Sequence, residues 1–291
     1  MTITIYLKGR LGNQLFQYAT LRNISIKKGY NFYINKDFSD HGQSVLLPYF
    51  NIPEVHPFTI YNYQYNQPID SNFFDKTIFD INDNTMIIGF FENVEYFKEN
   101  IDIIRNDLCI KDDYINNCSN NFLNSIIKDD YKLVGIHFRR GDLLKVINHY
   151  NDYNNNITDF NEIEKKFVYE SLNSIMKTES KITLLLFTGG IRKDLYESHL
   201  DNHTQENDIS WVRDFINEFK NKSEFSNISD IHISPGSIEN NELIDFSLLG
   251  KCDYIITPHQ STFSFMSYYL SKKKIQMYSR TNLYGGLPTN M

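Results

Sequence analysis

The apolar positions alternate between strand-like and helix-like spacing from the first residues onward. Residues 2–7 form an alternating, β-branched run, which predicts a strand. After a glycine-containing turn, apolar and small side chains recur at helical spacing over 14–28, and Gly29 is expected to end this helix. A second strand is predicted at 30–34. This order of strand, helix and strand is typical of a parallel α/β domain.

The remainder of the first half is less regular. Four prolines interrupt residues 41–83, and a long stretch of mainly helical character is predicted only at 95–124. A short polar run at 128–131 then precedes the next apolar stretch. We therefore expect an N-terminal α/β domain over residues 1–130 and a C-terminal α/β domain over 131–291.

The second half alternates apolar strands with helical stretches throughout. The run at 182–187 is apolar without alternation, which indicates a strand buried on both faces. The pattern as a whole predicts an α/β fold with two Rossmann-like, doubly wound domains facing a central cleft, near the carboxyl ends of their strands. In this half, strands are predicted at 133–138, 182–187, 230–233, 254–257 and 275–278, and helices at 160–177, 211–219, 241–251 and 262–270.

Composition and charge narrow the possible partners and the compartment. The formal net charge of −7 argues against nucleic acid as the main partner, but one small phosphorylated ligand needs only a local positive cluster. The 3 cysteines are odd in number and widely spaced, so we expect neither a disulfide framework nor a zinc site. The opening residues turn polar too soon for a signal peptide, and no stretch reaches the roughly 18 apolar residues of a membrane span. These features favour a cytoplasmic protein.

The richest candidate cluster is His-Phe-Arg-Arg-Gly-Asp at 137–142, at the end of a predicted buried strand. Side chains alternate along a strand, so His137 and Arg139 are expected on one face. An arginine suits phosphate because its planar fork stays charged and donates two hydrogen bonds. Gly141 permits a sharp turn, and Asp142 could hold an arginine in place. The alternative interpretation is a basic surface turn with a local ion pair.

Two further clusters lie between a predicted strand and a predicted helix. Residues 9–14, Gly-Arg-Leu-Gly-Asn-Gln, match neither the dinucleotide fingerprint nor a P-loop, and the alternative is a tight turn with Asn13 capping the helix. Residues 257–264 place Ser261 and Thr262 at or beside a helix N-terminus, where backbone N–H groups suit a phosphate. Simple capping by serine is the alternative there.

Some expected motifs are missing from the sequence. No Asp-x-Asp triplet follows an apolar strand, no histidines and cysteines stand at metal-ligand spacing, and no Gly-x-Ser-x-Gly turn occurs. If the protein catalyses a reaction in which a diphosphate leaves, the negative charge of that diphosphate would be met by arginine and helix N-termini rather than by a metal ion.

Taken together and in this order, the clusters resemble the α-1,2-fucosyltransferases of glycosyltransferase family 11, over nearly the whole chain. That family has a G-x-L-G-N-Q-[ML]-F-Q-[YF]-A segment, an H-x-R-R-G-D segment, a D-x-x-x-[LM]-x-x-C segment and an S-x-F-S-[WF] segment. The matching positions are Gly9 to Ala19, His137 to Asp142, then Asp245, Leu249 and Cys252, and finally Ser261, Phe263, Ser264 and Phe265.

The resemblance implies a two-domain GT-B-like fold, GDP-fucose as donor, no metal, and inversion at the transferred carbon. It implies that Arg139 pairs with the β-phosphate, that Arg140 braces the loop or assists, and that His137 lies near the ribose or base. Arg10 and Asn13 would face the reacting sugar. The expected donor-binding residues are Arg10, Gly12, His137, Arg139, Arg140, Asp208, Ser261 and Thr262, and the expected catalytic residues are Asn13, Arg139 and Asp142.

One segment departs from the family pattern. Members often carry S-D-D-I-x-W directly after the buried strand, whereas here the strand continues as Thr-Gly-Gly at 188–190 and Asn-Asp-Ile-Ser-Trp follows only at 207–211. This spacing indicates an insertion of roughly 18 residues, longer than ordinary connections. Asp208 is then the candidate reader of the guanine base.

The function implied is transfer of L-fucose from GDP-fucose to the 2-hydroxyl of a β-galactoside in a surface glycan. The acceptor would be a galactose-containing oligosaccharide or lipid-linked glycan, and the protein a bacterial enzyme with peripheral contact to the inner membrane. Two alternatives stay open: transfer of another GDP-linked deoxy sugar, and a catalytically silent glycan-binding protein of the same fold. The sequence does not identify the general base.

Overall fold

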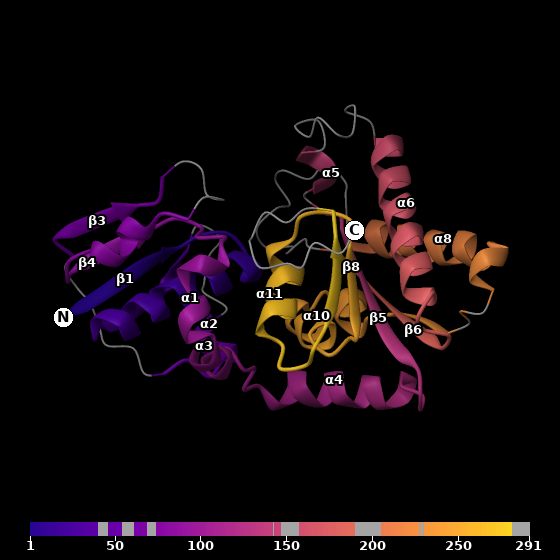
Figure 1. Cartoon of the computed structure of the whole chain (residues 1–291), viewed down its shortest axis with the longest axis horizontal. Coiled ribbons are helices and arrows are strands. Elements are labelled where there is room, and N and C mark those ends of the chain that lie inside the picture. Colours follow the sequence, from indigo (N-terminus) through magenta and orange to yellow (C-terminus); the bar gives the residue numbers. More distant parts are fainter. Residues whose placement is uncertain are drawn as a thin grey trace. The chain divides into compact units, whose positions relative to one another are not determined.

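The computed structural model contains two compact units, one formed around Met1–Asp113 and the other around Tyr114–Thr281 (Figure 1). The expected domain boundary after residue 130 lies beyond α4 (Asp113–Ile126), a helix that clusters with the second unit from Tyr114 onward. The residues that the structure describes are 1–39, 46–53, 61–68, 74–141, 143–146, 157–189, 205–226, 228 and 230–280.

The first unit is built on a four-stranded parallel sheet with strand order β2-β1-β4-β3. The chain leaves β1 toward β2 on one side and later returns to β4 on the other, so the order reverses between β1 and β4. Both early strands are confirmed, although the second is longer than predicted. The strands are β1 (Thr2–Leu7), β2 (Asn31–Ser39), β3 (Tyr63–Asn66) and β4 (Thr85–Ile88).

Helix α1 (Leu11–Lys28) follows β1 and is buried along most of its length. It begins three residues before the predicted start at 14, because the turn after β1 is short and passes directly into the helix. Gly29 ends it as expected: its φ of 65° is left-handed, and its N–H donates to the carbonyl of Ile26.

The prediction of a mainly helical stretch over 95–124 is confirmed, but the stretch is divided into several helices. The chain forms short turns and α3, and then leaves the helix so that Ile110 forms an antiparallel bridge with Phe50 and the Lys111 N–H donates to the carbonyl of Tyr49. This pairing with a distant segment breaks a pattern that looked continuous. The smaller elements of the unit are α2 (Leu46–Tyr49), η1 (Lys76–Asp80), η2 (Val94–Tyr96), η3 (Lys98–Asn100) and α3 (Ile101–Asp107).

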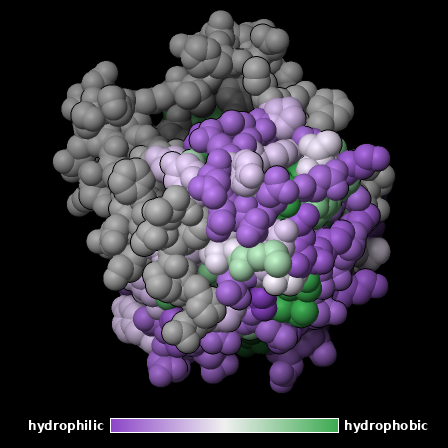
Figure 2. All heavy atoms as spheres, turned by 90° about the vertical axis from the view of Figure 1, so that its left-hand side faces the viewer, coloured by the Kyte–Doolittle hydropathy of each residue, from purple (hydrophilic) through white to green (hydrophobic). Residues whose placement is uncertain are grey.

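The side of the molecule shown in Figure 2 is mainly hydrophilic where it is coloured, with apolar side chains in small separate patches. No helix within the described ranges is long and apolar enough to cross a membrane.

The second unit is built on a five-stranded parallel sheet with strand order β7-β6-β5-β8-β9. The chain runs outward from β5 through β6 to β7 and then crosses to β8 and β9, so the order reverses between β5 and β8. All five strands match the predictions. They are β5 (Lys132–Arg139), β6 (Ile182–Gly189), β7 (Asp230–Ile233), β8 (Tyr254–Thr257) and β9 (Gln276–Ser279).

Helices cover both faces of this sheet, so β5 and β6 are buried on both sides. On one face, alternate residues of these strands pack with α6 (Ile157–Met176) and α8 (Gln205–Lys220) in a single apolar cluster. On the other face, a Cβ at Gly135 of β5 would lie 2.8 Å from Cys252 Sγ, so glycine makes room for the buried thiol. The remaining elements are α5 (Leu143–Val146), η6 (Ser223–Phe225), α9 (Pro235–Glu239), α10 (Glu242–Leu249) and α11 (Thr262–Leu270).

Candidate functional site

The candidate site of the second unit lies where the strand order reverses. Strand β5 ends at Arg139 and its parallel neighbour β8 ends at Thr257, with Ile136 opposite Ile256. Residues 258–261 then lead from β8 into α11. In open parallel sheets, the carboxyl ends of the strands at such a reversal are the usual place for a ligand.

His137 and Arg139 both turn toward the segment that follows β8. A hydrogen bond joins His137 Nδ1 to the hydroxyl of Ser264, and the His137 ring lies 5.5 Å from the ring of Phe263. Arg139 Nη1 donates to the backbone carbonyl of Gln260 at 2.7 Å. The expectation that the two side chains share one face of β5 agrees with these contacts.

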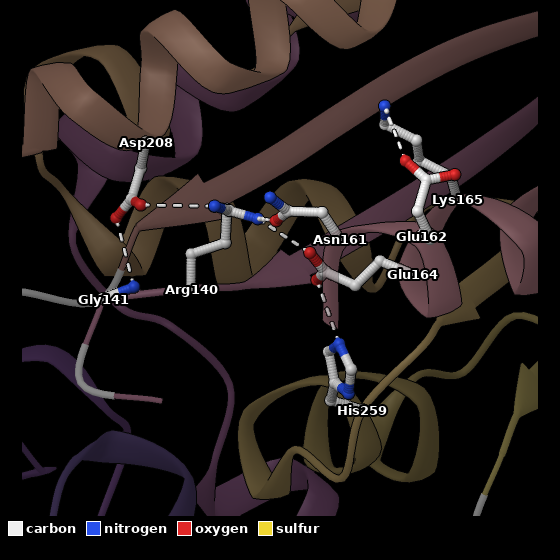
Figure 3. Close-up of polar contacts among 8 residues, drawn as sticks. All are labelled: Arg140, Gly141, Asn161, Glu162, Glu164, Lys165, Asp208 and His259. Atoms are coloured by element: carbon white, nitrogen blue, oxygen red, sulfur yellow. Dashed lines mark hydrogen bonds and ion pairs between the residues drawn. The ribbon is translucent and has the colours of Figure 1, made fainter. Parts of the chain in front are cut away.

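Arg140 turns the other way, because neighbouring side chains of a strand point to opposite faces. Its Nη1 donates to Glu164 Oε2 at 2.8 Å and to Asn161 Oδ1 at 3.0 Å, both on α6 (Figure 3). Its Nε lies 3.5 Å from Asp208 on α8, and the guanidinium stands 3.9 Å from the centre of the Trp211 ring. The side chain is only 5% exposed, so carboxylates and an aromatic face surround it.

Glu164 connects Arg140 with a histidine that sequence reasoning missed. Its carboxylate is fully buried, and its Oε1 lies 3.1 Å from His259 Nε2 (Figure 3). The His259 ring stacks on Phe160 at 4.3 Å. One signal was present in the sequence: Glu164 is charged yet lies on the helix face that carries Phe160 and Val168, where a charge normally needs a buried partner.

Asp208 lies in the first turn of α8 and is fully buried. One carboxylate oxygen accepts from the Gly141 N–H at 3.2 Å, and the other lies beside Arg140 Nε. A guanine base would have to displace one of these contacts to reach the carboxylate. Reading of guanine by Asp208 stays a prediction. Asp142 and most of the predicted insertion lie outside the described residues.

Ser261 caps α11, which agrees with the alternative interpretation of this segment as a simple helix cap. Its Oγ accepts from the Ser264 N–H at 3.2 Å, and Thr262 is the first residue of the helix. The first turn of α11 contains no acidic residue. The partial positive charge of a helix N-terminus therefore lies beside Arg139 at the carboxyl ends of β5 and β8, which suits an anion.

A third buried carboxylate, Asp245, joins the ends of β6 and β7 to α10. It accepts hydrogen bonds from the hydroxyls of Ser234 and Ser237, and the Ser237 oxygen accepts from the Thr188 N–H at 3.0 Å. Burial raises the pKa of Asp245 to about 7, while the serine hydroxyls act in the opposite direction. A Cβ at Gly236 would lie 2.4 Å from the carboxylate, so glycine is required for this close approach.

In the first unit, the turn between β1 and α1 is held by two glutamines. Gln14 Nε2 donates to the Gly9 carbonyl at 3.1 Å, and the Gln17 amide both accepts from the Lys8 N–H and donates to the Lys8 carbonyl. Capping of α1 by Asn13 is wrong: the N-cap position belongs to Arg10, and Asn13 lies inside the first turn. The Asn13 side chain instead packs over Gly9.

The predicted site residues that the structure describes thus fall into three groups. His137, Arg139, Ser261 and Thr262 come together at the carboxyl ends of β5 and β8, while Arg140 and Asp208 form a buried cluster behind them. Arg10, the N-cap of α1, and Gly12 and Asn13, in its first turn, lie at the glutamine-held end of that helix in the first unit. Across the described ranges, no group of three or more His, Cys, Asp or Glu side chains could hold a metal ion.

Two doubly wound parallel sheets, one ending in an arginine beside a helix N-terminus, define an α/β protein of the GT-B-like kind. Residues 1–285 match the model of glycosyl transferase family 11, and the chain belongs to that family of glycosyltransferases. No match is found among curated protein sequences.

Solved structures of fucosyltransferases share the fold at low sequence identity. The NodZ α-1,6-fucosyltransferase soaked with GDP-fucose is 15% identical over 99% of this chain and 97% of its own, with a TM-score of 0.58. Fucosyltransferase NodZ from Bradyrhizobium is 14% identical over 96% and 95%, with a TM-score of 0.54. POFUT1 in complex with GDP-fucose is 12% identical over 96% and 97%, with a TM-score of 0.58. The predicted α/β, GT-B-like fold is confirmed.

Proposed function

We propose that this glycosyltransferase moves L-fucose from GDP-fucose to the 2-hydroxyl of a β-galactoside, with inversion and without a metal ion. The observation that carries the proposal is Arg139 beside the N-terminus of α11, at the strand reversal of the second unit. Membership of family 11 supports a sugar donor, and the structures of similar fold include complexes with GDP-fucose.

Arg139 would bind the donor diphosphate. A guanidinium is planar and stays charged, so it can pair with a phosphate through two hydrogen bonds, and the bond to the Gln260 carbonyl directs Arg139 toward the start of α11. The backbone N–H groups at the start of α11 would add to the positive field. His137 would lie against the ribose or base.

In the reaction, the bond between the fucose anomeric carbon and the β-phosphate oxygen breaks, and its electron pair stays on GDP. The acceptor oxygen forms the new bond on the opposite face of the sugar and gives up its proton to a base or to water. Charge accumulates on the leaving diphosphate, so fixed positive groups around it lower the barrier most. Arg10, Gly12 and Asn13 are proposed to face the sugar.

The natural acceptor is proposed to be a galactose-containing oligosaccharide or lipid-linked glycan of a bacterial surface polysaccharide, modified in the cytoplasm at the inner membrane. This part of the proposal rests on family membership and sequence composition. The alternative donors are other GDP-linked deoxy sugars.

The test is incubation of the purified protein with GDP-fucose and a panel of β-galactosides, followed by measurement of released GDP and linkage analysis of the product. We expect α-1,2-linked fucose on galactose. A different linkage would correct the acceptor assignment. Faster GDP release from another GDP-linked deoxy sugar would correct the donor assignment. Binding of galactosides without any transfer from any donor would favour a silent glycan-binding protein.

A further inference from the structure

Glu164 joins two segments that are far apart in the sequence. One carboxylate oxygen accepts from Arg140, the residue that follows β5, and the other lies 3.1 Å from His259, in the segment between β8 and α11 (Figure 3). The carboxylate itself comes from α6, which packs on the same face of the sheet as α8. One side chain therefore ties a helix, a strand end and a loop together.

The cluster of Glu164, Asp208, Arg140 and His259 is buried, so its charged groups need partners at short range. Glu164 and Asp208 are fully buried, and Arg140 and His259 are nearly so. A buried charge is tolerated only when partners meet it at short range, and removal of one partner leaves another charge without compensation. The stacking of His259 on Phe160 and the bond from Thr257 Oγ1 to the His259 carbonyl restrict the loop further.

A second connection between the end of β5 and the same loop lies on the opposite face of β5. Arg139 donates to the carbonyl of Gln260, while its neighbour Arg140 reaches His259 through Glu164. Consecutive residues at the end of β5 are thus connected to consecutive residues of the loop. Ser261, the next residue, is the N-cap of α11. A shift of this loop would move the Gln260 carbonyl, and with it both Arg139 and the start of the helix.

We propose that Glu164 is a positioning residue for donor binding. Through Arg140 and His259 it fixes the segment 258–261, so that Arg139 and the N-terminus of α11 are held ready for a diphosphate. Glu164 itself does not touch the donor. The inference rests on the proposed function for the identity of the donor, but the bridging geometry stands without it.

The test compares Glu164→Gln with Glu162→Gln. Glu162 lies on the same helix, is 68% exposed and pairs only with Lys165 in the described contacts, so it is a matched control (Figure 3). Glu164→Gln is expected to raise both the KM for GDP-fucose and the Kd for GDP by about tenfold, the size of one lost charge-assisted hydrogen bond. The acceptor KM should not change. Glu162→Gln should match the wild type in every measurement.

This pattern separates positioning from mere stability. A variant that only folds less well contains fewer active molecules, which lowers the apparent kcat and leaves both KM values unchanged. The chain contains 1 tryptophan, Trp211, which lies against the Arg140 guanidinium. Its fluorescence emission should therefore shift in Glu164→Gln, while circular dichroism stays that of the wild type.

A double-mutant cycle with His259→Asn tests the bridge itself. If Glu164 acts through His259, the double variant should lose little more GDP affinity than either single variant, whereas independent roles would make the losses add. Wild-type GDP affinity in Glu164→Gln, or additive losses in the cycle, would overturn the proposal. If Glu164→Gln does not fold, His259→Asn decides alone: unchanged GDP affinity in that variant overturns it.

Failure of the proposed function would look different. A wild-type protein that binds GDP but releases none from GDP-fucose would refute fucose transfer. The Glu164 assignment would then be judged from GDP affinity, which requires neither the sugar nor the acceptor.

Discussion

Arg139 and Arg140 are consecutive in the chain and face opposite sides of one strand. Arg139 reaches the loop before α11, and Arg140 lies among the carboxylates of α6 and α8. Two identical side chains therefore have different surroundings: Arg139 lies where we propose that the donor diphosphate binds, and Arg140 is paired with buried acids.

Arg139→Lys tests the first of these roles. A lysine keeps the charge but loses the planar fork, so it cannot hold the Gln260 carbonyl and a phosphate in the same way. We expect kcat for fucose transfer to fall by about a hundredfold, with little change in the unfolding midpoint. Arg213→Lys, at an exposed arginine paired with Glu206, is the control. Near-normal turnover of Arg139→Lys would refute the phosphate assignment.

Asp245 gives a prediction on pH. Its pKa is raised by burial from an ordinary value near 3.8 to about 7 in the folded protein. Between these values the folded state binds more protons than the unfolded state, so this group makes stability fall as pH rises from about 4 to about 7. The full effect is on the order of 4 kcal/mol, at about 1.4 kcal/mol per pH unit.

Asp245→Asn should remove this contribution. Chemical denaturation at several pH values between 4 and 7 is expected to give a flatter stability profile than in the wild type. Asp102→Asn, at a side chain that is 91% exposed, should leave the wild-type profile intact. Identical profiles for wild type and Asp245→Asn would contradict the raised pKa.

At the scale of elements, the turn from β1 to α1 shows why Gly9, Gln14 and Gln17 occur together in one short segment. Gly9 has a φ of 69°, and the amides of Gln14 and Gln17 hold the turn through the backbone of Lys8 and Gly9. These hydrogen bonds place Arg10 and Asn13 at the carboxyl end of β1, beside the end of the neighbouring strand β4.

Gly9→Ala should destabilise the protein more than Gly29→Ala. Both glycines have a left-handed φ, which costs an alanine about 1–2 kcal/mol. Around Gly29 a Cβ meets no atom within 4 Å, whereas at Gly9 it would lie 2.2 Å from Asn13 Nδ2. Thermal unfolding should therefore show a larger loss for Gly9→Ala, together with lower transfer activity because Asn13 must move. Equal losses of stability would show that the Asn13 contact is unimportant.

At the scale of the whole molecule, each unit is a doubly wound parallel sheet whose strand order reverses beside a motif identified in the sequence. The reversals lie between β1 and β4 in the first unit and between β5 and β8 in the second. This topology places the motifs that contain Gly9, Arg139 and Ser261 at the carboxyl ends of β1, β5 and β8, where ligands of open sheets bind.

A further prediction at this scale concerns how GDP and a metal chelator affect the stability and activity of the protein. GDP at about a hundred times its Kd should stabilise the protein by about 2.7 kcal/mol, because it binds the folded state alone. With arginine and a helix N-terminus as the positive groups, a chelator should change neither this stabilisation nor transfer activity. Loss of either in the presence of EDTA, with recovery on added Mg²⁺, would show that a divalent ion takes part.

Much of the fold could be predicted from the sequence, because local patterns set it. Alternation and unbroken apolar runs located every strand of the second unit, and Gly29 ended α1 as expected. The stretch at 95–124 is mainly helical as predicted, but the bridge between Ile110 and Phe50 divides it into separate helices, which a local pattern could not show. The position of the candidate site also followed from strand ends, which sequence pattern can find.

The sequence by itself determined which residue types stand at the strand ends: Arg139 after a buried strand, and Ser261 before a helix. Only the tertiary structure decided what each side chain meets. Glu164 and His259 became visible as partners of Arg140 when α6 and the loop after β8 packed against β5. The physical reason is that local pattern follows backbone geometry, whereas the partner of a buried charge depends on which distant segments pack together and exclude water.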